Sequence, residues 1–437
     1  MGSSFIATPP MSAARAREIA TNFDLRVLPA DFYANPYPVY DVLRVTEPVR
    51  HMPDGSWFLT RYADLVAVYR DAQSFSSDKK VEFAPKYGAG SPLFAHHTTS
   101  LVFNDPPLHT RVRKLIMGAL TRRAISDMES GLVALVDRLL DAIEAKGGGD
   151  LIGDFAFAIP IEIIGNLLGV PHADRGPLRG WSLAILGALE PTLTAEQQAL
   201  GNASVSAFCA YLRDLVSERR QHPGDPEHDV LTRLAQGEKN ARPEDAGNGG
   251  QLSEMELLQN CIFILNAGHE TTTNLIGNAL VALQEWPQVK EDLAAQLRHT
   301  ARDPAAREAI MNRAVDEFLR FESSNQLGNR RALRPVSVGG FELPAGALVT
   351  LCIGAANRDP AQFPRADQLD IHRADNRHLA FGFGIHQCAG LSLARLEGRI
   401  AIGRFLARLP DYRLTARPIR GGRARFRGFL EARFEAG

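Results

Sequence analysis

Apolar residues recur at three- and four-residue intervals over long stretches of this chain, the spacing that gives a helix one apolar face. The clearest stretches cover residues 131–145, 205–220, 254–285 and 307–321. Runs typical of strands are short and few. Residues 57–60 form one, and residues 336–341 and 348–353 look like a pair joined by a turn at 344–346. The pattern predicts a mainly α fold with small β sheets.

Two segments lack this periodicity. Residues 237–251 are rich in Gly, Asn, Asp and Glu and are interpreted as a solvated internal loop between two helices of one domain. Residues 1–20 mix small, polar and charged side chains, without the basic start and apolar stretch of a signal peptide. They are predicted to form a flexible tail. The chain has no run of about 18 apolar residues, so no membrane anchor is predicted.

Composition narrows the picture further. The chain has 437 residues, with 49 basic and 50 acidic side chains, a balance that gives no general argument for binding nucleic acid or an anionic membrane. The four cysteines, Cys209, Cys261, Cys352 and Cys388, lie far apart, with neither a CxxC pair nor zinc spacing. We therefore expect free thiols in a reducing cytoplasm.

One of these cysteines lies in a distinctive loop. Residues 381–390 read Phe-Gly-Phe-Gly-Ile-His-Gln-Cys-Ala-Gly, and a helical pattern begins directly after them. A cysteine just before a helix start lies among free backbone N–H groups at the positive end of the helix dipole, which favours the thiolate. Such a thiolate is a good axial ligand for haem iron, and Phe381 could screen it from water. The alternative is an inert cysteine of the core, the commoner role of a free thiol.

A second segment carries chemistry inside the long helix predicted over residues 254–285. Residues 267–272 read Ala-Gly-His-Glu-Thr-Thr. The Thr271 hydroxyl is placed to reach the carbonyl of Ala267, four residues earlier. Glu270 beside Thr271 pairs an acid with an alcohol, and the two could relay protons with water between them. The alternative is a simple helix kink with a solvated glutamate.

Both segments resemble motifs of the cytochrome P450 family. The loop fills every fixed position of the family's haem-binding signature, Phe-Gly-x-Gly-x-His-x-Cys-x-Gly, and residues 267–271 match the Ala-Gly-x-Asp/Glu-Thr motif of its distal helix. Further landmarks at residues 35–38, 75–77 and 356–360 extend the resemblance over nearly the whole chain. It implies one domain, residues 1–437, with haem b buried between the distal helix and the cysteine-ligand loop.

The resemblance also implies roles for particular residues. It assigns the iron to Cys388 and proton delivery to Thr271 and Glu270. The residues that it places around the haem are Ala267, Gly268, Phe381, Gly382, His386 and Gly390, with His109, Arg113, Arg330 and His386 as partners of the two propionates. It joins Glu317, Arg320 and Arg373 in a buried structural triad behind the haem.

Substrate contacts are less specified. Residues 81–99, expected to be a loop, and residues 180–194 occupy the positions of the family's variable lid segments. Phe94, Asn266, Asn325 and Gln326 are candidate substrate contacts, although Asn325 and Gln326 could equally satisfy backbone groups of a tight turn. His96 and His97 could be interpreted as metal ligands, but two adjacent histidines in a loop are expected to face water.

The implied reaction is the insertion of one atom of O2 into a small organic substrate. Because the haem fold accounts for the whole length, electrons are expected from a separate ferredoxin or flavodoxin with its reductase. The protein itself is expected to be a monomer. Arg111, Lys114, Arg122 and Arg123 could form a basic docking face or an ordinary solvated one. Two alternatives remain: a peroxide-driven haem-thiolate enzyme, which tends to lack the acid–Thr pair, and a non-catalytic haem-thiolate sensor, which would not need it.

Overall fold

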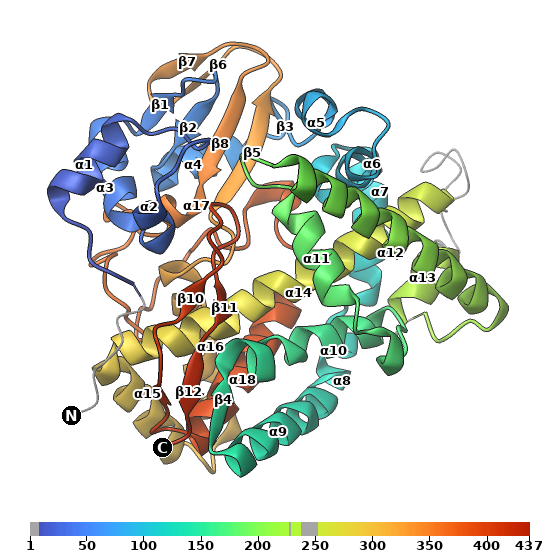
Figure 1. Ribbon diagram of the computed structural model, residues 1–437, viewed down its shortest axis with the longest axis vertical. Coiled ribbons are helices and arrows are strands. Elements are labelled where there is room, and N and C mark those ends of the chain that lie inside the picture. Colours follow the sequence, from blue (N-terminus) through green and yellow to red (C-terminus); the bar gives the residue numbers. More distant parts are fainter. Residues whose placement is uncertain (1–7, 227–228, 237–251) are drawn as a thin grey trace.

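Helices dominate the computed structural model, which describes residues 8–226, 229–236 and 252–437 (Figure 1). In chain order the α-helices are α1 (Ala13–Thr21), α2 (Ala30–Ala34), α3 (Tyr37–Thr46), α4 (Tyr62–Arg70), α5 (Lys80–Tyr87), α6 (Pro92–Thr99), α7 (Leu108–Ala119), α8 (Arg122–Asp127), α9 (Glu129–Lys146), α10 (Ala158–Leu167), α11 (Leu178–Gly187), α12 (Ala195–Gln221), α13 (Val230–Gln236), α14 (Glu254–Glu285), α15 (Pro287–His299), α16 (Pro304–Phe321), α17 (Ile353–Ala356) and α18 (Leu391–Arg408). Short helical turns of other pitch are η1 (Leu101–Phe103), η2 (Leu151–Ala156), η3 (His172–Asp174) and η5 (Gly384–His386).

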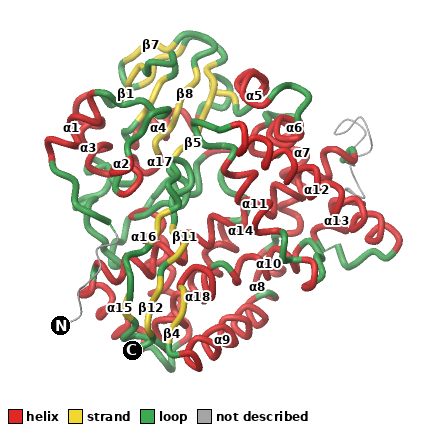
Figure 2. The backbone as a smooth tube through the Cα atoms, viewed as in Figure 1, coloured by secondary structure: helices red, strands yellow, loops and turns green. Residues whose placement is uncertain are grey.

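The strands form small sheets, the largest of which lies at the top of the view in Figure 2. This five-stranded sheet has the order β1 (Val49–His51), β2 (Trp57–Leu59), β8 (Leu348–Cys352), β5 (Leu327–Ala332) and β3 (Phe75–Ser76). The β2–β8 pair is parallel and the others are antiparallel. The remaining sheets are β4 (Gly148–Asp150) with β12 (Arg433–Glu435) and β9 (Arg413–Leu414), β10 (Ile419–Arg420) with β11 (Phe429–Glu431), and β6 (Val336–Val338) with β7 (Phe341–Leu343).

Helix α14 crosses the middle of the molecule and organises the largest hydrophobic core (Figure 1). A capping box starts it: the Ser253 hydroxyl accepts from the backbone N–H of Glu256, whose carboxylate accepts from the N–H of Ser253. Helices α10, α11, α12 and α18 pack around it. A helix surrounded in this way is covered on most sides, and nearly every residue from Leu257 to Leu283 is buried or half-buried.

The predicted helices are confirmed, with α14 starting and ending at the expected residues. The predicted pairing of residues 336–341 with 348–353 is wrong. Gly339 and Gly340 have φ values of 61° and 88°, which allow a tight turn that divides this segment into the hairpin β6–β7. Strand β8 is then free to pair with β2 and β5 instead.

Two other expectations need correction. The predicted tail over residues 1–20 is wrong from residue 13 onward, because α1 packs Ala16, Ile19 and Ala20 into a core. Residues 81–99 are mostly helical rather than a loop, since α5 and α6 cover them. The predicted loop at 237–251 lies outside the described residues. Within the part of the chain that is described, no helix has the length and apolar character needed to cross a membrane.

Candidate active site

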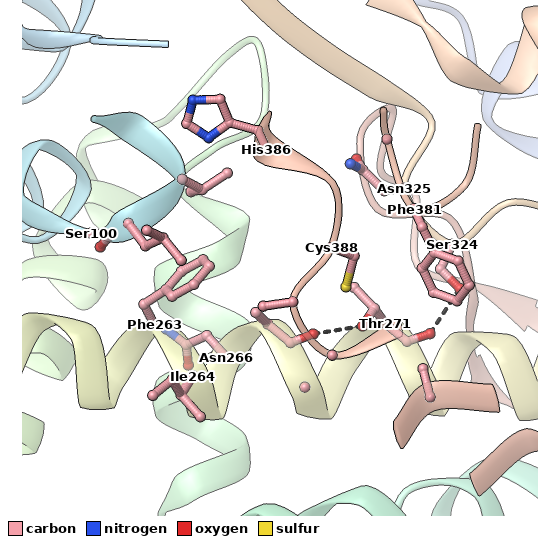
Figure 3. Close-up of a pocket in the computed structure, with 18 of the residues that line it drawn as sticks. Ser100, Phe263, Ile264, Asn266, Thr271, Ser324, Asn325, Phe381, His386 and Cys388 are labelled. Atoms are coloured by element: carbon pink, nitrogen blue, oxygen red, sulfur yellow. Dashed lines mark hydrogen bonds between the residues drawn. The ribbon is translucent and has the colours of Figure 1, made fainter. Parts of the chain in front are cut away.

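A cavity of about 330 Å³ lies between α14 and the loop 381–390. The α14 side contributes Ala267, Gly268 and Thr271, and the loop contributes Phe381 and Cys388. Figure 3 shows the Cys388 sulfur pointing into this space toward the stretch of α14 that carries Thr271. The two motifs, more than a hundred residues apart in sequence, therefore face one another across a single, mainly apolar chamber.

Glycines shape the loop that presents Cys388. Gly382 and Gly384 have φ values of 64° and 74°, a region that other residues rarely adopt. A Cβ on Gly384 would lie 2.3 Å from the carbonyl oxygen of Tyr69, so this position has no room for a side chain. The loop closes where the N–H of Cys388 donates to the carbonyl of Phe381 at 2.8 Å, and α18 begins three residues later.

The Cys388 side chain is half-buried, and its surroundings act on the pKa of its thiol in two directions. Burial raises the pKa above its usual value, whereas the N–H of Gly390 and the guanidinium groups of Arg113 and Arg395 lower it. The raising effect is the larger, so the helix start alone does not produce the thiolate that the sequence pattern suggested. A bound metal cation would supply the missing stabilisation, because metal binding deprotonates a coordinating thiol.

On the opposite wall, the Thr271 hydroxyl donates to the carbonyl of Ala267 at 2.6 Å, as its spacing predicted. The carbonyl of Thr271 in turn accepts from the Ser324 hydroxyl at 2.8 Å, and both bonds appear in Figure 3. Gly268 also lines the cavity, but a Cβ on it would meet Ile164 at 2.6 Å. Close packing of α10 against α14 is therefore one reason for glycine at this position.

Glu270 lies on a different side of α14 from Thr271. It does not line the cavity, and its carboxylate accepts a hydrogen bond of 2.5 Å from Nη1 of Arg423, in the loop between β10 and β11. The other carboxylate oxygen is buried without a hydrogen-bond partner. Burial raises the pKa of Glu270 to about 7, although Arg423 opposes the shift. A carboxyl group with this pKa can take up and release protons near neutrality.

Cationic and imidazole side chains gather along another part of the wall. The rings of His109 and His386 lie 4.1 Å apart between centroids, and Arg113 and Arg330 line the cavity with them. Burial and the neighbouring cations lower the pKa of His386 to about 2, and burial with Arg113 lowers the pKa of His109. Both ring nitrogens of His109 and Nε2 of His386 are buried without hydrogen-bond partners.

This arrangement suits haem b. The cavity lies between a helix and a loop, and a sulfur faces into it. Imidazole nitrogens without hydrogen-bond partners and two guanidinium groups without a carboxylate partner lie along its wall, and such groups require acceptors. A haem carries two propionate carboxylates that need such donors. The residues present therefore fit the cofactor, with Cys388 as the candidate iron ligand and His109, Arg113, Arg330 and His386 as candidate propionate partners.

Of the four candidate substrate contacts, Asn266 and Asn325 line the cavity and Phe94 and Gln326 do not. Both amide atoms of Asn266 and the oxygen of Asn325 are buried without hydrogen-bond partners. Gln326 is instead turned into the protein, where its Nε2 donates to the carbonyl of Ser323 at 2.7 Å. Its side chain satisfies the backbone of a turn, which was the other possibility left open by the sequence.

One of the two lid segments differs from expectation. His96 and His97 are 3% and 1% exposed and line the cavity from α6, so the expectation that they face water is wrong. Aromatic packing explains this, since the His97 ring lies within 6 Å of Phe83, Tyr87 and Phe103. The second segment, predicted at 180–194, contributes Leu186 and Leu189 to the wall.

Behind the cysteine loop, the predicted triad forms a buried ion cluster. Arg320 donates to both carboxylate oxygens of Glu317, at 2.8 and 2.7 Å, and Nε of Arg373 donates to Glu317 at 3.1 Å. Arg320 also donates to the carbonyls of Asn357, Ala366 and Gln368. Fully paired charges of this kind hold segments distant in sequence in one geometry.

One part of the predicted basic docking face is compensated within the chain. Arg111 forms an ion pair with Glu256 of α14, so it does not present an uncompensated charge. Lys114, Arg122 and Arg123 are exposed, and Nε of Arg123 lies 4.0 Å from the carboxylate of Asp127.

The sequence pattern missed three arginines around the site: Arg423, Arg425 and Arg427. All lie in the C-terminal segment 421–428, between β10 and β11, which has no recognisable motif. Arg425 lines the cavity and Arg427 pairs with Glu322. The only available signal was the density of arginine in Arg-Gly-Gly-Arg-Ala-Arg-Phe-Arg, residues 420–427.

Comparison with known proteins agrees with this site. The family model described as "Cytochrome P450" matches residues 188–410. A vitamin D(3) 25-hydroxylase of Pseudonocardia autotrophica is 38% identical, covering 88% of this chain and 89% of that protein. A biotin biosynthesis cytochrome P450 of Bacillus subtilis (strain 168) is 34% identical, covering 90% and 95%.

A solved structure has the same architecture. The crystal structure of P450BioI in complex with hexadec-9Z-enoic acid ligated acyl carrier protein superposes with a TM-score of 0.83 at 31% identity, covering 93% of this chain and 99% of that one. The fold predicted from the sequence is thereby confirmed. With relatives this similar over most of their lengths, the chain belongs to the cytochrome P450 family and is a monooxygenase that uses haem b.

Proposed function

We propose that Cys388 is the axial thiolate of the haem and that the enzyme hydroxylates a small, mainly apolar organic molecule in the cavity above it. When bound, a haem with a thiolate ligand would activate O2, so that one oxygen atom is inserted into the substrate and the other leaves as water with the uptake of two electrons and two protons. The observation that carries the proposal is the Cys388 sulfur facing Thr271 across one cavity.

The residues of the wall hold and orient the cofactor in this proposal. Arg113 and Arg330 pair with the propionates, and the imidazoles of His109 and His386 donate hydrogen bonds to them. The depressed pKa values of both histidines keep the rings neutral at physiological pH, so each ring offers one N–H donor. Gly382 and Gly390 allow the loop to pass close to the macrocycle, and Phe381 covers the sulfur.

Proton delivery involves both faces of α14. Glu270 takes protons from the side of Arg423, and its pKa of about 7 lets it exchange them at neutral pH. Thr271 orients the groups that receive these protons inside the cavity. The apolar lining from Leu275, Leu327 and Phe426 limits water near the substrate.

The redox partner is a separate ferredoxin or flavodoxin supplied by its reductase, and the enzyme acts as a cytoplasmic monomer. The exposed Arg122 and Arg123 of α8 support docking of an acidic partner. Charge-reversed Arg122→Glu and Arg123→Glu variants should slow reduction by an acidic ferredoxin at low salt, with the difference from wild type shrinking as salt rises.

The absorption spectrum of the dithionite-reduced protein under carbon monoxide tests the proposal. A Soret band strongly red-shifted from that of His-ligated haem is expected in wild type and in Cys209→Ser, a matched loss of a different free thiol, and should disappear in Cys388→Ser. An unshifted band in wild type would overturn thiolate ligation. Turnover with reductase and ferredoxin supports the monooxygenase route, whereas equal turnover with hydrogen peroxide alone indicates a peroxygenase. If the protein shows no turnover under either condition, a sensor is indicated.

A further inference from the structure

The charges that line the cavity do not balance when the haem is counted. Three guanidinium groups line it, those of Arg113, Arg330 and Arg425, and none forms an ion pair with a carboxylate in the described chain. The one lining carboxyl group is Glu397, and burial raises its pKa to about 8, so it is protonated at neutral pH. A haem adds two propionates, while a ferric iron, the porphyrin dianion and one thiolate sum to zero. One cation therefore remains.

The histidines of the wall do not alter this count. Burial lowers the pKa of His96 to about 4 and that of His97 well below its usual value. Burial and Arg113 lower the pKa of His109 as well. These three rings are neutral at physiological pH, so they add no positive charge and compensate none.

Arg425 is the remaining cation by position. Arg113 and Arg330 both lower the pKa of His109, whose ring lies 4.1 Å from that of His386, so both arginines lie beside the cysteine loop. Arg330 and Arg425 both act on the pKa values of Tyr69 and Lys79, but of these two arginines only Arg425 also lowers the pKa values of Lys86 and His97, on α5 and α6. It therefore lies toward the lid side of the cavity, where a substrate would be held.

Burial lowers the pKa of the Arg425 guanidinium and the nearby Glu190 carboxylate opposes this shift, but the side chain that the guanidinium hydrogen-bonds is neutral. Nη2 of Arg425 donates to the Asn329 side-chain oxygen, and Nδ2 of Asn329 donates to the Thr350 hydroxyl at 2.9 Å, which fixes the orientation of the amide. Its Nε is buried without a hydrogen-bond partner. The carboxylate of Glu190 accepts from the backbone N–H groups of Ala424 and Arg425 and forms no ion pair with the guanidinium.

The backbone on both sides of Arg425 is anchored, so the side chain is presented by a fixed loop. The N–H of Gln326 donates to the carbonyl of Arg425 at 2.8 Å, and the N–H of Arg427 donates to the carbonyl of Ser324 at 2.8 Å. Between these bonds, Asn325 pairs with Phe426 as an isolated bridge. Asn325 also lines the cavity, and its side-chain oxygen has no hydrogen-bond partner.

We infer that Arg425 is a specificity-determining residue that binds a carboxylate of the substrate, so the substrate is an organic acid with an apolar body. Arginine suits this function because its planar donors match a carboxylate in two-point contact. The apolar lining from Phe263, Ile264 and Leu186 accepts the rest of the molecule. This inference rests on the proposed function, because it assumes that haem fills the space beside Cys388.

A spectroscopic binding series tests the inference without catalysis. The probes are ω-(imidazol-1-yl)alkanoic acids of six to twelve carbons and their methyl esters. The imidazole anchors each probe to the haem iron and shifts the Soret band, so every probe gives a dissociation constant. Wild type should bind the acid about tenfold more tightly than the ester at the best chain length, since a buried charge-assisted contact is worth about that factor.

Variants identify the residue responsible. The preference for the acid should fall to within about twofold in Arg425→Gln and persist in part in Arg425→Lys, which keeps the charge. Arg331→Gln is the matched control, because Arg331 lies in the neighbouring strand β5, pairs with Glu82 and does not line the cavity. It should keep the full preference.

Three outcomes would overturn the inference. The first is that wild type binds acids and esters equally at every chain length. The second is that Arg425→Gln keeps the preference for the acid. The third is that Arg425→Gln keeps this preference and also loses haem as fast as Arg113→Gln, which would make Arg425 a propionate partner. These are separable from failure of the proposed function. Haem without a red-shifted band under carbon monoxide would refute thiolate ligation and still leave the acid-to-ester ratio measurable.

Discussion

The Glu270 carboxylate and the Arg423 guanidinium form a 2.5 Å ion pair on the side of α14 that faces away from Cys388. The acid of the distal helix is thus tied to the C-terminal segment of the chain, and the alcohol next to it faces the cavity. In the proposed function, proton entry and substrate binding therefore take place on different sides of one helix. This division makes the two functions separable by mutation.

Glu270 should give the enzyme a pH dependence near neutrality. Glu270 must carry the proton that it delivers, so turnover should fall as pH rises through its pKa of about 7. Because Arg423 lowers that pKa, Arg423→Gln should move the midpoint to higher pH. Glu270→Gln should lose this ionisation and slow turnover at least about tenfold. Rates measured with a redox partner between pH 5.5 and 9 report all three, and a profile unchanged in Glu270→Gln would exclude it from proton delivery.

Removal of the Thr271 hydroxyl should uncouple electron use from product formation. We expect Thr271→Ala to consume reductant at a near wild-type rate while releasing most of the electrons as hydrogen peroxide. Thr273→Ala is a close control, because Thr273 makes the same bond, to the carbonyl of His269 at 3.0 Å, yet does not line the main cavity. The ratio of product to reductant consumed separates the two variants. Full coupling in Thr271→Ala would contradict the role given to it.

Loss of a propionate partner should weaken haem retention more than chemistry. Arg113→Gln and Arg330→Gln each remove a half-buried cation without an ion-pair partner in the described chain, so each should raise the rate of haem transfer to apomyoglobin by about tenfold or more. Arg122→Gln is the control. Arg122 is an exposed arginine of α8 that does not line the cavity, so this variant should leave the transfer rate unchanged. Equal rates in all three proteins would remove the propionate assignment.

Glu322 should make the fold sensitive to acid. Burial acts to raise its pKa, but Arg427, Arg420 and Arg358 outweigh burial and lower the pKa from 4.5 to about 2. A carboxyl group with a lower pKa in the folded state stabilises the fold above pH 4.5 and loses that contribution as pH falls toward 2.

Chemical unfolding of Glu322→Gln should therefore show a loss of about 3 to 5 kcal/mol at pH 7, typical of breaking a buried pair, and a weaker dependence on pH between 4.5 and 2 than wild type. Glu47→Gln changes an exposed partner of Arg50 and should cost little. A Glu322→Gln protein as stable as wild type would show that the contacts of Glu322 with the surrounding arginines contribute nothing to the stability of the fold.

The local parts of this molecule were predictable from sequence and the distant parts were not. Helix α14 and the Cys388 loop are encoded by contiguous residues, so their spacing alone indicated their structure. Glu322 and Arg427 are 105 residues apart, and no periodicity relates them. The hairpin β6–β7 was missed because Gly339 and Gly340 permitted a turn inside a run that otherwise read as one strand. Arg425 was missed for the same reason as Arg427: its importance arises only from what packs around it.

The bond between Thr271 and Ala267 sets a direction for hydrogen bonding in the cavity. A hydroxyl has one hydrogen, and here that hydrogen is already engaged by a carbonyl of its own helix at 2.6 Å. Toward the cavity the oxygen of Thr271 offers only lone pairs. While this bond is formed, Thr271 can accept a hydrogen bond from a group in the cavity but cannot donate a proton to it. The protons must therefore pass along a chain of water molecules that does not include the Thr271 hydroxyl.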